Sequence, residues 1–368
     1  MIPVNEPLIG AVERAYVDEC LRTGWISSAG RFIDEFEQAW AAYCGMEHGI
    51  AVTNGSAALE LAVWALDLEP GDEIIMPTFT IVSCALAAVY NGAVPVLVDS
   101  EPDTWCMDVG QIEAKITPRT KAIMPVHIYG HPVDMGPVRE LADTYGLTVI
   151  EDAAEAHGAT YRDSRCGGLG DVSCFSFYAN KIVTTGEGGM ALTNDAALAA
   201  RLRSGRNLCF RDERRFWHTE AGHNYRLTNM QAAVGLGQVE RIDELVAAKR
   251  HMGARYTAAL SGLPLELPVE REWAQNVYWM YGIVLTQEAG MDAREFATRL
   301  AQLGVQTRPF FLGMHEQPVF LESGLFAGES YPVAENLARF GLYLPSGLAL
   351  THEQQDEVAA AVREVLGA

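Results

Sequence analysis

A single lysine, Lys181, stands between two apolar runs near the middle of the chain. The first run, 172–178, is rich in β-branched and aromatic residues, and the second, 190–192, follows the glycine-rich turn 186–189. Such runs predict buried strands. Because burial lowers the pKa of an amine, a buried lysine can attack a carbonyl carbon. Lys181 is therefore a candidate to bind an aldehyde cofactor such as pyridoxal phosphate. The alternative is a lysine that reaches to water from a strand end.

Three carboxylates and a histidine follow a predicted strand at 147–150, in the run Glu151-Asp152-Ala-Ala-Glu155-Ala-His157. The carboxyl ends of strands are where open α/β sheets bind ligands. Asp152 can pair with a pyridinium nitrogen and keep it protonated, so that the ring accepts electrons. The alternative is helix capping by Asp152, with Glu155 in the first turn. For Glu151 the sequence favours capping or a solvated surface.

A third motif, Asn54-Gly55-Ser56-Ala57, links a predicted strand at 50–52 to an apolar helix. The N-terminus of a helix offers backbone amides to an anion, and the Ser56 hydroxyl adds a donor, so the motif suits a phosphate. A serine that only caps the helix is the alternative. A lysine, an aspartate and a phosphate-binding helix in this order are more specific together than any one alone.

Taken together, these motifs resemble the DegT/DnrJ/EryC1/StrS family of sugar aminotransferases over nearly the whole chain. The matching stretches are 54–58, 104–108, 125–132, 151–158, 176–181, 185–189, 223–233 and 307–310. The resemblance implies the fold of type I pyridoxal-phosphate transferases, which is like that of aspartate aminotransferase. We therefore expect an α/β chain with a three-layer α/β/α large domain around a mostly parallel sheet, residues 1–245 with an N-terminal helical segment. A smaller α+β C-terminal domain, residues 246–368, is expected to follow.

The same resemblance implies a role for each site residue. Lys181 would bond to the cofactor and later move a proton between cofactor and substrate carbons, and Asp152 would hold the pyridine nitrogen. The complete set expected to bind pyridoxal phosphate is Gly55, Ser56, Ala57, Ile81, Asp152, Glu155, Ser176, Lys181 and Asn224. Residues expected near the substrate are Trp25, Arg226, Arg308, Phe310 and His315.

Two of these positions carry further implications. Relatives commonly have an aromatic residue where this chain has Ile81, so the resemblance does not identify the residue that stacks on the cofactor ring. Phe79 could stack on the ring only if its loop were rotated. Asn224 resembles an asparagine that completes the phosphate site of the neighbouring subunit, which implies a homodimer with shared active sites. The alternative is that Asn224 caps the helix that follows it.

The implied reaction moves the amino group of L-glutamate to C4 of a nucleotide-linked 4-keto-6-deoxysugar. Among subgroups the resemblance is greatest to the one that converts GDP-4-keto-6-deoxymannose to GDP-perosamine for surface polysaccharide. Alternatives are a dTDP- or UDP-linked keto sugar, a keto-cyclitol, a pyridoxal-phosphate-dependent sugar dehydratase, or a non-catalytic module. A dehydratase branch carries histidine in place of the lysine, so Lys181 favours amino transfer.

Composition limits the partners. The 368 residues include 27 basic and 48 acidic ones, a net charge of −21, which argues against nucleic acid and anionic membranes as partners. An anionic nucleotide sugar would then need a local basic patch, for which the candidates are Arg206, Arg211, Arg214, Arg215 and Arg226.

No apolar run approaches the length of a membrane span, and the N-terminus lacks signal-peptide features, so the expected location is the cytoplasm.

The seven cysteines are scattered, and none forms a Cys-x-x-Cys pair. We expect neither disulfides nor a zinc site, and most cysteines should be small buried residues. His127 and His131 are four residues apart, but Gly130 and Pro132 prevent a helix that would place them on one face. No metal site is therefore expected.

Periodicity gives a coarse map of the elements. Beyond the strands already named, strands are predicted at 73–76, 94–98, 122–126, 278–285 and 305–311. Helices are predicted at 8–22, 32–44, 57–66, 81–90, 109–115, 136–145, 224–260, 293–303, 331–339 and 353–366.

Overall fold

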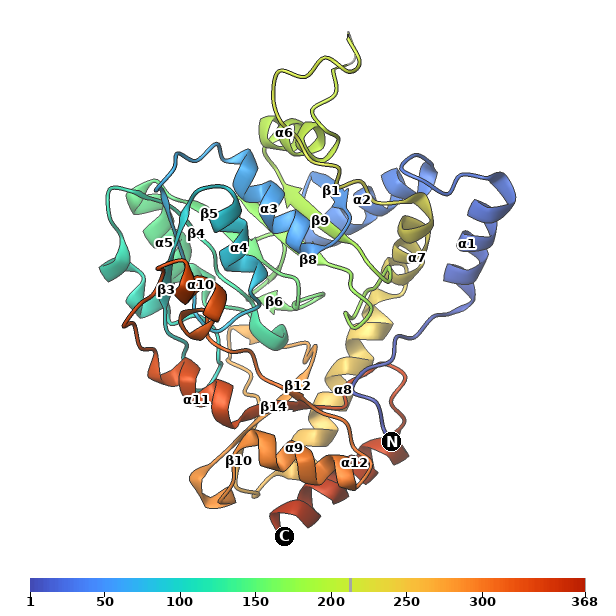
Figure 1. Ribbon diagram of the computed structural model, residues 1–368. Coiled ribbons are helices and arrows are strands. Elements are labelled where there is room, and N and C mark those ends of the chain that lie inside the picture. The colour runs from blue at the N-terminus through green and yellow to red at the C-terminus, as the bar shows by residue number, and fades with distance from the viewer. Residues whose placement is uncertain (212–213, 368) are drawn as a thin grey trace.

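The computed structural model describes residues 1–211 and 214–367, and its centre is a seven-stranded sheet (Figure 1). In sheet order the strands are β1 (His48–Val52), β9 (Gly189–Thr193), β8 (Val172–Ser176), β5 (Thr148–Asp152), β4 (Thr120–Ile123), β2 (Glu73–Pro77) and β3 (Val94–Val98). Only β9 runs antiparallel to its two neighbours. The mostly parallel sheet that was predicted is therefore confirmed.

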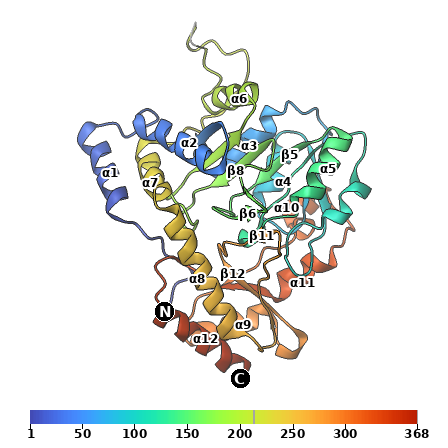
Figure 2. The ribbon, with the colours of Figure 1, turned by 180° about the vertical axis from the view of Figure 1, so that it is seen from behind.

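Helices cover both faces of this sheet, as the predicted three-layer architecture requires. The helices that pack on the sheet are α2 (Arg31–Cys44), α3 (Gly55–Ala65), α4 (Ser83–Tyr90), α5 (Met135–Tyr145) and α6 (Ala196–Arg206). Two more helices, α1 (Ala11–Thr23) and α7 (Asn229–Val239), pack against each other, and α7 packs on α2. Helices α3 and α4 lie on the face seen in Figure 1, whereas α2 and α5 lie on the face seen in Figure 2. Parallel strands are apolar on both sides and need such double cover.

The remainder of the chain forms a second unit around an antiparallel four-stranded sheet. The strands are β10 (Leu265–Glu266), β12 (Tyr281–Leu285), β14 (Gly341–Leu344) and β13 (Arg308–Pro309). The helices are α9 (Ala293–Gln302), α10 (Pro318–Glu322), α11 (Pro332–Phe340) and α12 (His352–Leu366). A small third sheet of β7 (Ser164–Arg165), β6 (Thr160–Tyr161) and β11 (Ala274–Gln275) joins the two parts of the chain.

Helix α8 (Ile242–Leu260) connects the two hydrophobic cores. Leu245 and Val246 pack in the core around the seven-stranded sheet, whereas Met252 and Tyr256 pack in the core of the second unit. The predicted domain boundary after residue 245 lies inside this helix and stays a prediction. The single helix predicted over 224–260 is wrong, because Thr228 caps α7 and a break separates α7 from α8.

Two other predicted elements are shorter than expected. The helix predicted at 109–115 is a pair of 3-10 turns, Val109–Gln111 and Glu113–Lys115, because the Asp108 side chain accepts the Gly110 amide and starts a tight turn. The strand predicted at 305–311 is reduced to Arg308–Pro309.

In the part of the chain that the structure describes, no helix combines the length and apolar character needed to cross a bilayer.

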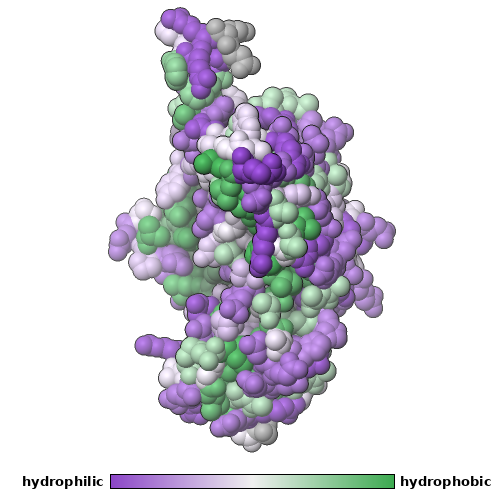
Figure 3. Space-filling model, turned by 90° about the vertical axis from the view of Figure 1, so that its right-hand side faces the viewer, coloured by the Kyte–Doolittle hydropathy of each residue, from purple (hydrophilic) through white to green (hydrophobic). Residues whose placement is uncertain are grey.

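The connection between α6 and α7 projects from the body of the molecule (Figure 1). Seen from the side in Figure 3, many of the residues on this projection and on the face below it are hydrophilic. The projection contains three of the predicted arginines, Arg211, Arg214 and Arg215, and Phe216 and Trp217 are exposed on it. Arg206 instead ends α6, and Arg226 pairs with Val52 of β1.

Candidate cofactor site

Lys181 follows β8 and points into a cavity of about 440 Å³, here named the cofactor cavity. Its side chain is 9% exposed, and its Nζ lies 3.6 Å from Glu155 Oε1 and 3.4 Å from the centre of the Trp279 ring. Burial lowers the pKa of Lys181, while the carboxylates of Glu155 and Asp152 act in the opposite direction. The predicted burial of this lysine is confirmed, and it does not reach to water as a strand-end lysine would.

Asp152 ends β5 and lines the same cavity. Its Oδ1 accepts the Ala154 amide at 3.0 Å, and its Oδ2 accepts the Cys84 thiol at 3.2 Å. Burial raises the pKa of Asp152, and these hydrogen bonds together with Lys181 offset part of the rise. Residues 153–159 form turns, so Asp152 does not cap a helix as the alternative reading required.

Glu155 lies between the backbone and Lys181. Its Oε2 accepts the Tyr129 amide at 2.8 Å, and its other oxygen faces the ammonium group. Burial raises the pKa of Glu155 to about 7, against the attraction of Lys181. A carboxyl group with this pKa can hold or release a proton near neutral pH.

The cofactor cavity is also lined by hydroxyl donors from three elements, Ser56 at the start of α3, Ser83 at the start of α4 and Ser176 at the end of β8. The Ser56 and Ser83 hydroxyls are 2.6 Å apart. A side chain at Gly55 would bring its Cβ within 2.6 Å of the Ser176 Cβ, so only glycine allows this approach of α3 to β8. The Ala57 amide already donates to Asn54 Oδ1 at 2.8 Å. The expectation that the Ala57 amide binds the anion is therefore corrected, and the amides of the first helical turn remain.

A second, larger cavity of about 790 Å³ lies under the α6–α7 connection. Five arginines line it: Arg203, Arg206, Arg211, Arg215 and Arg226. Arg206 is paired with Glu37, and Arg226 donates to Asn207 Oδ1 at 2.8 Å. We name it the arginine cavity. It unites four of the five predicted basic residues, and the fifth, Arg214, instead lies over the Trp217 ring.

Comparison with known proteins agrees with this geometry. Residues 7–363 match the model of the DegT/DnrJ/EryC1/StrS aminotransferase family. The chain belongs to this family. The GDP-perosamine synthases of Caulobacter vibrioides and Escherichia coli O157:H7 are 46% and 41% identical to it, in alignments that cover 99% of the chain and 98% of each relative. That of Vibrio cholerae is 37% identical, with the same coverage.

Solved structures of the family superimpose on the whole molecule. The aminotransferase TlmJ of Streptoalloteichus hindustanus has a TM-score of 0.93 at 31% identity, covering 100% of this chain and 99% of its own. DesV of Streptomyces venezuelae, solved with a ketimine intermediate, has a TM-score of 0.88 at 37% identity, covering 97% and 94%. The protein is thus a sugar aminotransferase that depends on pyridoxal phosphate, with the fold expected from its motifs.

For a member of this family, the cofactor cavity holds the groups that pyridoxal phosphate requires. The Lys181 amine would meet the aldehyde, the buried Asp152 carboxylate would meet the ring nitrogen, and the serine hydroxyls with the helix amides would meet the phosphate. Ile81 lines the cavity and is 40% exposed. Phe79 is buried against Phe310 and Tyr129, so it does not stack on the cofactor.

Sequence reasoning missed several lining residues. They are Asn54, Leu59, Thr80, Ser83, Val126, Ala154, Tyr178, Asn180, Glu187, Trp279, Phe311 and Tyr343. Tyr178 and Asn180 lie in the recognised lysine motif and could have been proposed from it. Trp279, Phe311 and Tyr343 come from the second unit, at least 98 positions from Lys181, where no motif marks them.

The residues expected near the substrate lie outside the cofactor cavity of their own chain, as does Asn224, which was expected to bind the cofactor. Trp25 and Asn224 are exposed, and Arg226 lines the arginine cavity. Arg308 lies at a third surface cavity beside α9, where it donates to its own Thr307 carbonyl.

Two of the expected substrate residues are packed into the protein interior, which corrects their assignment. Phe310 is 4% exposed and packs against Phe79 and Trp105. His315 is 5% exposed, with its Nδ1 at 2.8 Å from Thr78 Oγ1. Both side chains therefore support the packing around the site instead of reaching the substrate.

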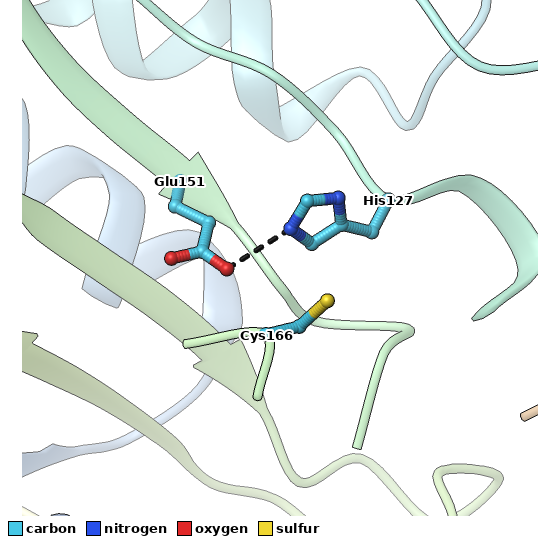
Figure 4. A group of neighbouring side chains, drawn as sticks. All are labelled: His127, Glu151 and Cys166. Atoms are coloured by element: carbon cyan, nitrogen blue, oxygen red, sulfur yellow. Dashed lines mark hydrogen bonds and ion pairs between the residues drawn. The ribbon is translucent and has the colours of Figure 1, made fainter. Parts of the chain in front are cut away.

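The expectation for Glu151 was wrong. Glu151 is fully buried on the sheet face opposite Asp152, beside His127 and Cys166 (Figure 4). It accepts His127 Nε2 at 2.9 Å, Ser173 Oγ at 2.7 Å and three backbone amides. Burial acts to raise the pKa of Glu151, but hydrogen bonds and His127 outweigh it, and its pKa is lowered.

The grouping of His127, Glu151 and Cys166 has the residue types of a metal site. However, His127 Nδ1 accepts the Val133 amide at 3.0 Å, so the ring proton is on Nε2, where a metal ion would bind. Burial raises the pKa of the Cys166 thiol well above its usual range, which disfavours the thiolate that metals require. His127 and Glu151 therefore form a hydrogen-bonded pair in the core, and Cys166 lies beside them.

Proposed function

We propose that the protein transfers the amino group of L-glutamate to C4 of GDP-4-keto-6-deoxymannose, giving GDP-perosamine. The observation that carries the proposal is the convergence of Lys181, Asp152 and Glu155 in one cavity with an anion-binding end. The choice of sugar is supported by three relatives of that name, 37–46% identical over nearly their full lengths.

In this proposal each residue has a distinct task. Lys181 binds the cofactor and, when released, moves a proton between carbons, and Glu155 holds a proton beside it. Asp152 keeps the ring nitrogen protonated, while Gly55, Ser56 and Ser176 bind the phosphate. The cofactor supplies an electron sink that stabilises negative charge at the substrate carbon.

We further propose a homodimer in which each subunit completes the other's site. Asn224 is exposed on the strand-like segment that leads into α7 and does not line the cofactor cavity of its own chain, which leaves it available to a neighbouring subunit. The arginine cavity beside it offers positive charge in a chain of net charge −21, which suits the diphosphate of a nucleotide sugar. The cytoplasmic location stays a prediction.

A two-step absorbance experiment tests the reaction. L-glutamate is added to the purified holoenzyme, and GDP-4-keto-6-deoxymannose is then added to the same cuvette. We expect the visible band of the bound cofactor to fall with the amino acid and to return with the sugar. A band that glutamate leaves unchanged would contradict amino transfer from this donor.

The same experiment tests the choice of sugar. The dTDP- and UDP-linked 4-keto-6-deoxysugars are supplied in place of the GDP-linked one, and recovery with either of them but not with GDP would contradict the proposed substrate. K181A is the control that should show no band. For the shared site, mixed dimers of K181A and N224A should regain activity from their one intact site, and a failure of mixing to restore activity would contradict it.

A further inference from the structure

A second buried lysine, Lys249, lies on α8 and is 2% exposed. Its Nζ donates to the Trp279 carbonyl at 2.7 Å and to the Ser346 carbonyl. Burial lowers the pKa of Lys249 to about 7, and no charged neighbour contributes to that change. Burying an amine without a carboxylate is costly, so an apolar residue would be the simpler choice for core packing alone.

The two carbonyls that Lys249 joins belong to segments that shape the cofactor cavity. Ser346 follows β14, and its Oγ accepts the Tyr281 amide at 2.9 Å at the start of β12. Trp279 lies two residues before that strand and lines the cavity. Through the Trp279 and Ser346 carbonyls, Lys249 therefore links α8 to the segment just before β12 and to the segment just after β14.

The Trp279 side chain connects the hydrogen bonds of Lys249 to Lys181. Its Nε1 donates to the Asn180 carbonyl at 2.8 Å, directly before Lys181 in the chain. The Lys181 Nζ lies 3.4 Å from the ring centre, a distance at which the ring attracts an ammonium ion. The ring thus stabilises the protonated form of Lys181 whenever this side chain is not bonded to the cofactor.

We propose that Lys249 is a positioning residue that fixes the backbone of Trp279, so that the Trp279 ring stays over Lys181 and stabilises its ammonium form. This inference rests on the proposed role of Lys181 as the residue that bonds to pyridoxal phosphate. Lys249 acts through Trp279 and touches neither cofactor nor substrate.

The test measures the amine of Lys181 directly. Pyridoxal phosphate is added to the cofactor-free, full-length protein across a pH series, and the rate at which the visible band appears gives the midpoint for Lys181 deprotonation. In K249M, whose side chain has similar length and no donor, we expect this midpoint to fall by about 0.5 to 1.5 pH units. Loss of a positive charge near Lys181 would by itself raise the midpoint, so the direction separates the two causes.

Further variants decide whether Trp279 carries the effect. W279L should lower the midpoint similarly, and the K249M/W279L double variant should lower it no further. Q355M is the matched control, because Gln355 is also buried and donates to the α8 carbonyl of Met252 at 2.7 Å. Its midpoint should equal that of the wild type. If K249M does not fold by circular dichroism, K249L, which also has no donor, is measured in its place.

An unchanged or raised midpoint in the Lys249 variant, or additive effects in the double variant, would overturn the proposal. A wild-type protein that forms no band would instead contradict the proposed function, because Lys181 would then not bind the cofactor. The two failures are therefore distinguishable in one series of measurements.

Discussion

Glu151 and Asp152 are adjacent carboxylates on β5, but their side chains occupy opposite faces of the sheet. Glu151 accepts five hydrogen bonds in a closed core network, and its pKa is lowered. Asp152 accepts one amide and one thiol beside an open cavity, and its pKa is raised. Equal burial thus produces opposite shifts, because the number of donors differs.

This difference separates stability from chemistry. A carboxylate whose oxygens are all occupied can hold neighbouring loops together but has no capacity left for a ligand. A buried carboxylate with few partners is costly for the folded protein, and a cationic ligand that approaches it is stabilised. The two faces of β5 therefore have different tasks, and amide substitutions at neighbouring positions should reveal them.

D152N should have the largest effect on activity. An amide in place of the carboxylate cannot keep the cofactor nitrogen protonated, so we expect the rate of the glutamate half-reaction to fall by roughly 10²- to 10³-fold. The urea midpoint of unfolding should change little, because the substitution removes a costly buried charge. Stopped-flow absorbance and urea titration check both expectations, and a strong loss of stability with unchanged rate would reverse the assignment.

E151Q is the matched substitution one residue away. Its amide NH2 group would replace one carboxylate oxygen and face the donors bound there, either the Gly167 amide at Oε1 or the Leu169 and Gly170 amides at Oε2. We therefore expect a loss of about 3 kcal/mol in the free energy of unfolding. The protein that remains folded should retain its half-reaction rate within a few fold. A fully stable E151Q protein would show that the network is dispensable.

The contrast between these neighbours also explains how far the sequence could be interpreted. Lys181 and Asp152 lie in local motifs, and the types and order of the residues in those motifs predict their chemistry. Glu151 was misplaced because β5 continues through Asp152, two residues beyond the predicted strand end, and a position inside a central strand is buried. Trp279 and Lys249 were not predicted, because their contacts join segments far apart in the chain.

The pH dependence of the free energy of unfolding tests the environment of Glu155, which lines the cofactor cavity. Its pKa is raised from 4.5 to about 7, so the folded protein binds this proton more tightly than the unfolded chain does. The resulting stability is complete below about pH 4.5 and is lost as the pH rises through about 7. In cofactor-free protein, E155Q should lack this dependence and gain up to about 3 kcal/mol on the wild type between these pH values. Urea titrations at several pH values would show parallel curves if the carboxyl group were unperturbed.

The smallest expected effect concerns ring stacking at Ile81, which lines the open side of the cavity. Phenylalanine at this position can stack on the pyridine ring, a gain of about 1 kcal/mol over an aliphatic contact. I81F should therefore bind pyridoxal phosphate up to about fivefold more tightly, as measured by equilibrium dialysis. I81L, an aliphatic control of equal volume, should bind within about twofold of the wild type. Equal affinities of the two variants would mean that Ile81 does not face the ring.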